Sequence, residues 1–277
     1  MDMPLIHVMV RVVAHENRKN RPKWYSKELR LASLVDSVST ARRNGINART
    51  IALLDSSGPS PYPDLDFALA DFDEVRRIKG GSASRSWRAM LRVISRELKG
   101  LDDGDIVYFV EDDHLHTKEA ITVLNGTEAD YTFLYSTDVD SASANGGWTR
   151  AHSGVSSFAV RASVLRKDFR RLYVFSYSRN AWDNLTCHAL SRDLPAVYLF
   201  SQRIEDPLDH EGRVTLAAKF SYQLLWTLIA LAWVSKPRSL AACVPNQAAH
   251  AELQHLPLGR DWGQTAASIK IGPEGAP

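Results

Sequence analysis

Cysteine is scarce in this chain, and its scarcity limits the folds and compartments that fit the sequence. The two cysteines, Cys187 and Cys243, lie far apart and form no C-x-x-C pattern. A disulfide framework or a zinc site built on cysteines therefore has no support. A reducing compartment, the cytoplasm, fits this cysteine usage best.

The chain also lacks a strong excess of charge of one sign. Its formal net charge is +2, and charged residues make up 24% of the 277 residues. A broad electrostatic case for nucleic acid as a partner is therefore absent. The hydrophobic content of 44% is ordinary for a globular protein. The length fits one large α/β domain, or such a domain with a C-terminal appendage.

Long apolar runs are missing as well. The stretch from Phe220 to Val234 is nearly all apolar but is short for a bilayer span, which needs about 20 residues. It suits a buried helix or a contact within a homodimer. Trp226, Trp233 and the flanking cations also suit a helix at a membrane surface, so peripheral membrane contact stays open. Residues 1–13 lack the features of a signal peptide and are expected to form a strand.

Strand and helix patterns alternate through the N-terminal half. Strands are predicted at residues 6–13, 50–54, 106–110 and 131–135, and helices at residues 27–43, 86–98 and 118–124. This alternation indicates right-handed crossovers and a mainly parallel sheet. Residues 76–84 are predicted to be a basic, glycine-bearing loop, and residues 148–161 a loop that enters a strand. Ligands of such sheets bind beyond the carboxyl ends of the strands.

An acidic run, Glu111-Asp112-Asp113, directly follows the apolar strand at residues 106–110. Three adjacent carboxylates repel one another, so they fit either a solvated turn or a place where a cation compensates them. Mg²⁺ and Mn²⁺ prefer oxygen ligands and bind through one or two carboxylates together with substrate phosphates. The run therefore predicts a divalent metal that bridges to a diphosphate and neutralises a leaving group.

The segment from Asp105 to Asp113, DIVYFVEDD, resembles the DxD-type motif of GT-A fold glycosyltransferases, especially the family 2-like group. The resemblance implies a Rossmann-like, mainly parallel sheet flanked by helices, with a helical C-terminal extension. It implies an enzyme, a metal-dependent hexosyltransferase that moves a sugar from a nucleoside-diphosphate sugar to a hydroxyl acceptor. Asp113 would hold Mn²⁺ or Mg²⁺, Glu111 would face the ribose or base, and Asp112 would assist either role. Glu111 occupies a position where Asp is commoner.

Further residues are expected on the donor side of this site. Arg11, at the end of the first strand, is a candidate contact for phosphate or base, although it also fits a surface cation. Asp55, after the second strand, resembles the acidic residue that contacts the nucleoside, although aspartates also cap loops. Lys79 and Gly81 precede a helix, where backbone amides and a nearby cation suit a diphosphate.

The acceptor side is expected in the second half of the chain. Asp183 resembles the general base of inverting members, which deprotonates the acceptor hydroxyl, but an aspartate here is also a good helix N-cap. Asn184 stands where the family motif often has a second acid. Trp182 and His152 are candidate acceptor contacts, and Gly154 would allow a sugar to approach the backbone.

A late histidine, His210, resembles the residue that completes the metal shell in several GT-A enzymes; a lone loop histidine is the alternative. The expected organisation is a nucleotide-sugar and acceptor domain at residues 1–212. Residues 213–277 would form an apolar helix and a tail, packed on the core or close to a membrane.

Two other functions remain open. A nucleotidyltransferase usually carries a glycine-rich loop with Lys or Arg directly after its first strand, and residues 15–18 read His-Glu-Asn-Arg instead. A non-catalytic binding domain of the same fold is the third reading, against which the acidic run argues. The sugar, the nucleobase and the class of acceptor are open.

Overall fold

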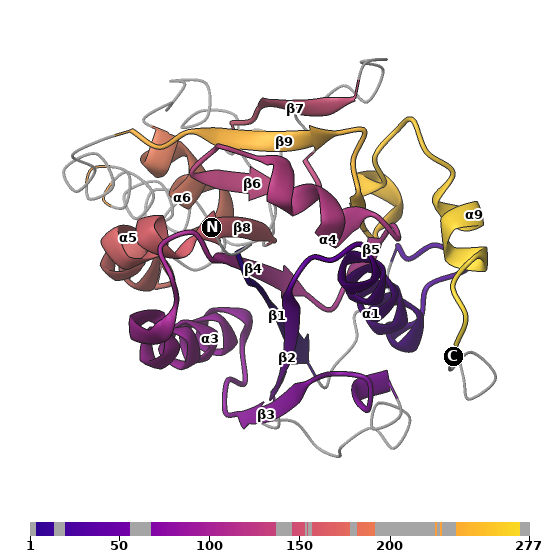
Figure 1. Ribbon diagram of the computed structural model, residues 1–277, viewed down its shortest axis with the longest axis horizontal. Helices are drawn as coiled ribbons and strands as arrows, with labels where there is room; N and C mark the ends of the chain where they lie inside the picture. The colour runs from indigo at the N-terminus through magenta and orange to yellow at the C-terminus, as the bar shows by residue number, and fades with distance from the viewer. Residues whose placement is uncertain are drawn as a thin grey trace, which may run out of the picture.

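A mainly parallel sheet of eight strands forms the centre of the computed structural model (Figure 1). The model describes residues 4–13, 20–55, 68–136, 146–152, 154, 157–177, 182–191, 225, 228 and 237–271, with only the backbone of residues 182–185 and 188. The strands are β1 (Ile6–Val13), β2 (Ala48–Asp55), β3 (Glu74–Ile78), β4 (Ile106–Glu111), β6 (Tyr131–Phe133), β7 (Gly147–Arg150), β8 (Phe158–Arg161) and β9 (Leu240–Val244). Their order is β3-β2-β1-β4-β8-β6-β9-β7.

The first four strands of this order run parallel, whereas β8 is antiparallel to both β4 and β6. β9 runs parallel to β6, and β7 closes the sheet in antiparallel pairing with β9. The carboxyl ends of β1, β2 and β4 therefore meet at one edge, which is where ligands of open α/β sheets bind. The expected α/β arrangement, a Rossmann-like and mainly parallel sheet flanked by helices, is confirmed.

Helices cover both faces of the sheet (Figure 1). α1 (Lys27–Arg43) and the short α4 (Ala120–Val123) pack on one face, with the 3-10 turn η2 (Leu124–Gly126) after α4. α3 (Ala83–Glu97), followed by η1 (Leu98–Gly100), packs on the other face with α5 (Ala162–Phe175) and α6 (Trp182–Ser191). The core is thus two apolar layers, one on each side of the sheet.

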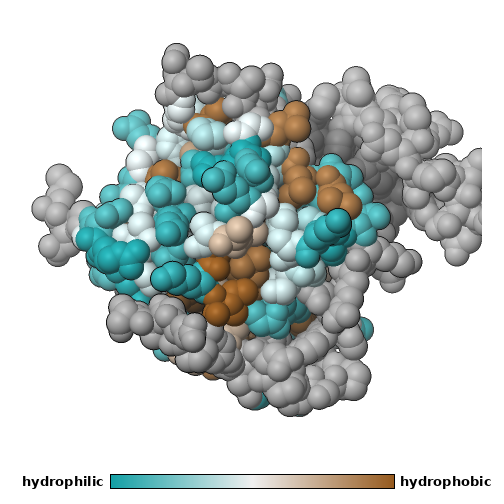
Figure 2. Space-filling view, turned by 90° about the vertical axis from the view of Figure 1, so that its right-hand side faces the viewer, coloured by the Kyte–Doolittle hydropathy of each residue, from teal (hydrophilic) through white to brown (hydrophobic). Residues whose placement is uncertain are grey.

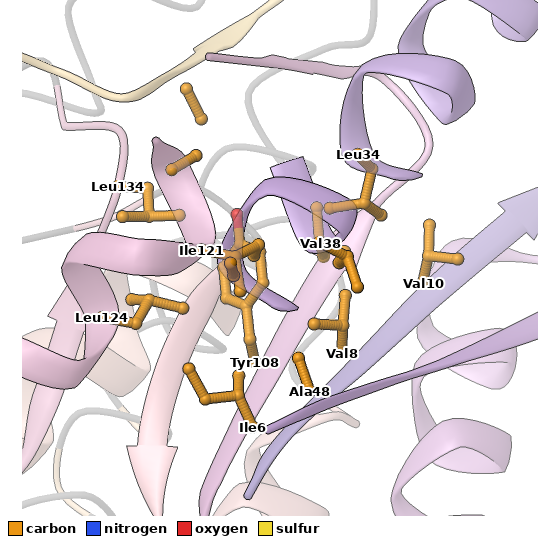
Figure 3. Packing of buried hydrophobic residues seen from close by; sticks show 14 of the residues in the cluster. Ile6, Val8, Val10, Leu34, Val38, Ala48, Tyr108, Ile121, Leu124 and Leu134 are labelled. Carbon is orange, nitrogen blue, oxygen red and sulfur yellow. The ribbon is translucent and has the colours of Figure 1, made fainter. Parts of the chain in front are cut away.

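The alternation of β1 explains how one strand serves both layers. Ile6, Val8 and Val10 point into the layer under α1 and α4, around the buried ring of Tyr108 (Figure 3). Met9 belongs to the opposite layer. Because successive side chains of a strand point to opposite faces, Arg11 lies on the same side as Met9, toward α3.

Most strands and helices predicted from local pattern are confirmed. β1 has the predicted bounds, and α1 begins after Ser26, whose side chain accepts a hydrogen bond from the Leu29 N–H. The helix ends at Arg43, and Gly45 then adopts a φ of 79°, which glycine reaches without steric cost.

The loop predicted at residues 76–84 is partly wrong, because residues 74–78 form the edge strand β3. Its charged side chains hide the strand pattern: Arg76 pairs with Glu74 and also with Glu97 of α3. Charged side chains on an edge strand are a common protection against pairing with other chains. Residues 147–150 likewise form a strand, β7, where a loop was expected.

The C-terminal segment contributes strands that the sequence did not reveal. β9 lies inside the main sheet, and β10 (Ala248–His250) pairs with β5 (His114–His116) in a small second sheet. The 3-10 turn η4 (Leu253–His255) and α9 (Trp262–Ala267) follow. The predicted boundary at residue 212 and most of residues 220–234 lie outside the described residues.

The surface on the side of α9 is mainly hydrophilic, with small hydrophobic areas (Figure 2). The C-terminal segment supplies three exposed apolar side chains, Leu253, Leu258 and Ile271. Isolated exposed apolar side chains of this kind are ordinary on a protein surface. In the described part of the chain, no helix combines the length and apolar character needed to cross a bilayer.

Candidate nucleotide-binding site

The acidic run stands at the carboxyl end of β4, next to the end of β1. Glu111 is in register with Arg11, and the Asp112 N–H donates to the Arg11 carbonyl at 3.1 Å. The first strand and the acidic run are therefore fixed to one another by backbone pairing. Side chains from both segments meet at this edge.

The Glu111 carboxylate pairs with the guanidinium of Arg11. Arg11 is almost fully buried, and its Nη1 also lies 3.5 Å from the Ala83 carbonyl at the start of α3. Burial by itself lowers the pKa of Arg11, but the carboxylates of Glu111, Asp112 and Asp113 outweigh it and raise the pKa above its usual value. Arg11 therefore holds the acidic run against α3 and is not an isolated surface cation.

Asp112 pairs with Lys27, the first residue of α1. Lys27 Nζ lies 2.9 Å from Asp112 Oδ2, and both side chains are nearly buried, with 6% and 7% of their surfaces exposed. The same carboxylate oxygen accepts the Val13 N–H at 2.9 Å, and Lys27 donates to the Val13 carbonyl. Three elements, β1, α1 and β4, are joined at this point.

Asp113 lies between two histidines. His250 Nε2 is 2.8 Å from Asp113 Oδ2, and His114 Nδ1 is 2.9 Å from Oδ1. The pairing of β10 with β5 places His250 opposite His114, with ring centroids 5.3 Å apart. The Ala251 N–H also donates to the Asp113 carbonyl at 2.9 Å. Arg21 Nη2 lies 3.8 Å from Asp113 Oδ2.

The protonation of these groups follows from their mutual contacts. Burial raises the pKa of Asp113, but the adjacent His250 and His114 outweigh it and hold the pKa well below its usual value. Burial lowers the pKa of His250, yet Asp113 outweighs it and raises the pKa. Burial dominates for His114, whose pKa is lowered. The shifts of Asp113 and His250 both favour the ionic pair of a carboxylate with an imidazolium.

Asp55 organises the loop between β3 and α3. Its carboxylate accepts hydrogen bonds from the Gly80 N–H at 3.0 Å, the Gly81 N–H at 2.9 Å and the Ser86 hydroxyl at 2.5 Å. A Cβ on Gly80 would lie 2.1 Å from Ser86 Oγ, so only glycine fits there. Gly81 has a φ of 74°.

The residues predicted on the donor side differ in how well their contacts suit a diphosphate. The Gly81 N–H, expected to face a diphosphate, is directed at Asp55 instead. Lys79 is exposed and makes no ion pair within the described part of the chain, so its ammonium is open to an anion. A contact of Asp55 with a nucleoside stays a prediction, beside its evident role in shaping the loop.

The groups around Asp113 determine whether a divalent metal could bind there. Within the described ranges, no three or more His, Cys, Asp or Glu side chains gather into a metal-binding group. Mg²⁺, however, needs only one or two protein ligands when phosphates and waters supply the rest. Neighbouring ligands of such an ion, with bonds of about 2.1 Å, lie about 3 Å apart. Asp113 Oδ2 and His250 Nε2 are 2.8 Å apart in a direct hydrogen bond, so these two donor atoms suit Mn²⁺ only once the proton between them has left.

The structure describes the residues predicted on the acceptor side only in part. His152 is exposed. Gly154 is buried, and a Cβ there would lie 2.0 Å from the Phe133 ring, so packing alone accounts for glycine. Trp182 and Asp183 begin helix α6, which the sequence suggested, but their side chains lie outside the described residues, as does His210. Their proposed roles stay predictions.

Sequence reasoning missed three residues that contact the acidic run. They are Arg21, Lys27 and His250. Arg21 and Lys27 were weakly indicated by the high density of basic residues that follow the first strand. His250 had no local signal, because its place depends on pairing between strands that lie more than 100 residues apart.

Comparison with known proteins adds little to this site. No protein-family model and no curated protein matches the chain. A solved 4-diphosphocytidyl-2C-methyl-D-erythritol synthase is 16% identical, over 61% of this chain and 80% of that chain, with a TM-score of 0.36. HddC from Yersinia pseudotuberculosis is 9% identical, over 58% and 79%, with a TM-score of 0.31. Likenesses this loose transfer no function to the chain.

Proposed function

We propose that this protein is a transferase that binds a nucleoside-diphosphate sugar at the carboxyl edge of β1, β2 and β4. Its preferred reaction in this proposal is transfer of the sugar to a hydroxyl acceptor. The observation that carries the proposal is the pairing of Asp113 with His250, at the end of the acidic run. In this proposal His250 takes the part of the late histidine that the resemblance implies; His210 lies outside the described residues, and its role stays a prediction.

In this proposal Asp113 and His250 hold Mn²⁺ or Mg²⁺, and the substrate diphosphate and water complete the shell. When bound, the ion supplies charge neutralisation for the diphosphate leaving group. Both protein ligands come from a rigid part of the fold, because β5 and β10 fix His250 relative to Asp113. A preformed pair of this kind loses little freedom when the substrate binds.

The remaining residues have positioning roles in the proposal. Arg11 and Lys27 neutralise Glu111 and Asp112, so the run carries less negative charge toward a diphosphate than its three acids suggest. Lys79 is an exposed cation beside the start of α3 and would meet a phosphate there. Asp183 would take the proton from the acceptor hydroxyl, which makes the reaction inverting.

Nucleotidyl transfer is the second candidate, and one observation favours it. The segment between β1 and α1 lacks glycine but is rich in cations; Arg21 from this segment and Lys27, the first residue of α1, approach the acidic run. A Lys- or Arg-bearing segment after the first strand is typical of enzymes that bind a nucleoside triphosphate there. Such an enzyme would transfer the nucleotidyl group of a nucleoside triphosphate to a sugar phosphate and release pyrophosphate.

The two reactions differ in the product that they release. Glycosyl transfer, or slow hydrolysis of the donor without an acceptor, releases a nucleoside diphosphate. Nucleotidyl transfer releases pyrophosphate from a nucleoside triphosphate and a sugar phosphate. The test incubates the full chain with panels of both substrate types, with Mn²⁺ or with EDTA, and measures both products.

We expect Mn²⁺-dependent release of nucleoside diphosphate, with losses of about 100-fold or more in Asp113→Asn and His250→Gln, in the range seen when ligands or their close partners are replaced. Glu119→Gln, an exposed acid near the run, is the matched control and should keep full turnover. Pyrophosphate release alone would establish nucleotidyl transfer instead. Tight nucleotide binding without any product would indicate a binding domain.

A further inference from the structure

A row of five cations runs along the outer face of α3 and into the turn that follows it. Their spacing of three or four residues places them on one side of the helix. The row consists of Arg85, Arg88, Arg92, Arg96 and Lys99. At about 1.5 Å per residue it extends about 21 Å from the end of α3 nearest the candidate site.

Helix α5 and the turn that follows it lie beside this row and contribute a row of aromatic side chains. Phe169, Tyr173 and Tyr177 follow one another at four-residue spacing, with neighbouring ring centroids 6.2 Å and 6.0 Å apart. The Arg88 guanidinium lies 4.1 Å from the centre of the Tyr177 ring, and Arg92 Nη2 donates to the Tyr173 hydroxyl at 2.8 Å. The two helices therefore present cations and rings together.

The acids of these two helices do not neutralise the row. Glu97 bonds to Arg76 of β3. Asp168 is fully buried and pairs with Arg171 and Arg238. Within the described residues, several exposed cations of this region have no ion-pair partner: Arg85, Arg96, Lys99, Lys167 and Arg170. A chain with a net charge of only +2 thus concentrates positive charge on one face.

We propose that this α3–α5 face, formed by the cation row and the aromatic row, docks on an anionic phospholipid surface. Each Lys or Arg near such a surface adds about fivefold to binding. Tyrosine rings suit the headgroup region, and Tyr177 is 49% exposed. The inference stands whether or not the proposed transferase reaction is correct.

Charge and shape favour a lipid surface over a nucleic acid. Single-stranded nucleic acids bind by stacking bases on open aromatic faces in a basic groove. Here a guanidinium lies over the Tyr177 ring, and the cations follow the outside of a helix. Cations in a straight row on the outside of a helix can all contact a flat lipid surface at the same time. The apolar stretch at residues 220–234, with its flanking cations, is a second sequence feature of the same kind.

The test uses sedimentation of the full chain with phosphatidylcholine vesicles, with and without phosphatidylglycerol. The row variant is Arg96→Glu with Lys99→Glu, at two exposed positions distant from the candidate site. The matched control is Arg43→Glu with Lys118→Glu, which makes the same change of charge at exposed positions elsewhere. Circular dichroism checks that both variants are folded.

We expect the wild type to bind only the vesicles that contain phosphatidylglycerol, more weakly as salt rises. The row variant should lose about tenfold or more in affinity, and the control should stay within about twofold. Absence of binding by the wild type, or equal losses in both variants, would overturn the proposal. So would a row variant that binds vesicles normally but loses binding to a fluorescent single-stranded RNA.

Discussion

Replacing Lys27 with methionine probes how the acidic run is compensated. The substitution keeps the apolar stem of Lys27 and removes its ammonium, which lies 2.9 Å from Asp112 Oδ2. Both side chains are more than nine-tenths buried. Breaking a buried ion pair from one side costs about 3–5 kcal/mol, because the partner charge stays buried. Asp112 keeps the Val13 N–H as a donor, so we expect the lower end, about 3 kcal/mol.

The measurement is urea unfolding followed by tryptophan fluorescence, since the chain contains seven tryptophans. Lys27→Met, Asp112→Asn and the double variant form a mutant cycle. The double variant should recover part of the loss, with a coupling energy of about 2 kcal/mol. Lys118→Met, at an exposed position, should change stability by less than about 0.5 kcal/mol. If Lys27→Met costs less than about 1 kcal/mol with no coupling, the pair behaves as a surface salt bridge and the reasoning is wrong.

Two further substitutions test the surroundings of the site. Gly80→Ala should lower stability by about 2 kcal/mol or more in the same urea assay, because its Cβ would lie 2.4 Å from Asp55 Oδ2 and closer still to Ser86 Oγ; a neutral effect would contradict the packing of this loop. Burial lowers the pKa of His116, which is 2.9 Å from the Tyr108 hydroxyl, to about 3, so its contribution is present above pH 6.5 and is lost as the pH falls toward 3. His116→Gln should therefore flatten the fall of melting temperature between pH 6.5 and 4, and an unchanged slope would contradict this.

The residue pattern within single segments, with their capping residues, predicted the strands and helices that form from local interactions. β1 and α1 have the expected bounds because each carries its own periodicity, and Ser26 and Gly45 mark the ends of α1. The place of the acidic run also followed from sequence, since a strict apolar strand leads into it. These features need no knowledge of the rest of the chain.

Non-local pairing accounts for most of what was missed. β9 enters the sheet beside β6, although more than 100 residues separate them, and β10 does the same beside β5. A three-residue strand such as β10 has too little sequence to show a period. His250 reaches Asp113 only through that pairing, so the sequence alone did not connect these two residues.

The sequence alone also overstated the uncompensated negative charge of the acidic run. Three adjacent carboxylates suggested an external cation, yet Arg11 and Lys27 neutralise two of them. Neither cation is adjacent to the run in sequence. The case for a metal therefore rests on Asp113 and His250 alone.

The most direct test of the central claim is binding of Mn²⁺ with a nucleoside diphosphate, followed by electron paramagnetic resonance. Free Mn²⁺ gives a strong signal that weakens when the ion binds, so the assay needs neither acceptor nor turnover. The account predicts that the wild type binds Mn²⁺ together with one of UDP, GDP, CDP or dTDP. Asp113→Asn and His250→Gln should each lose this binding, and Glu119→Gln should keep it. Unchanged binding in both site variants, or nucleotide binding that ignores Mn²⁺, would contradict the account.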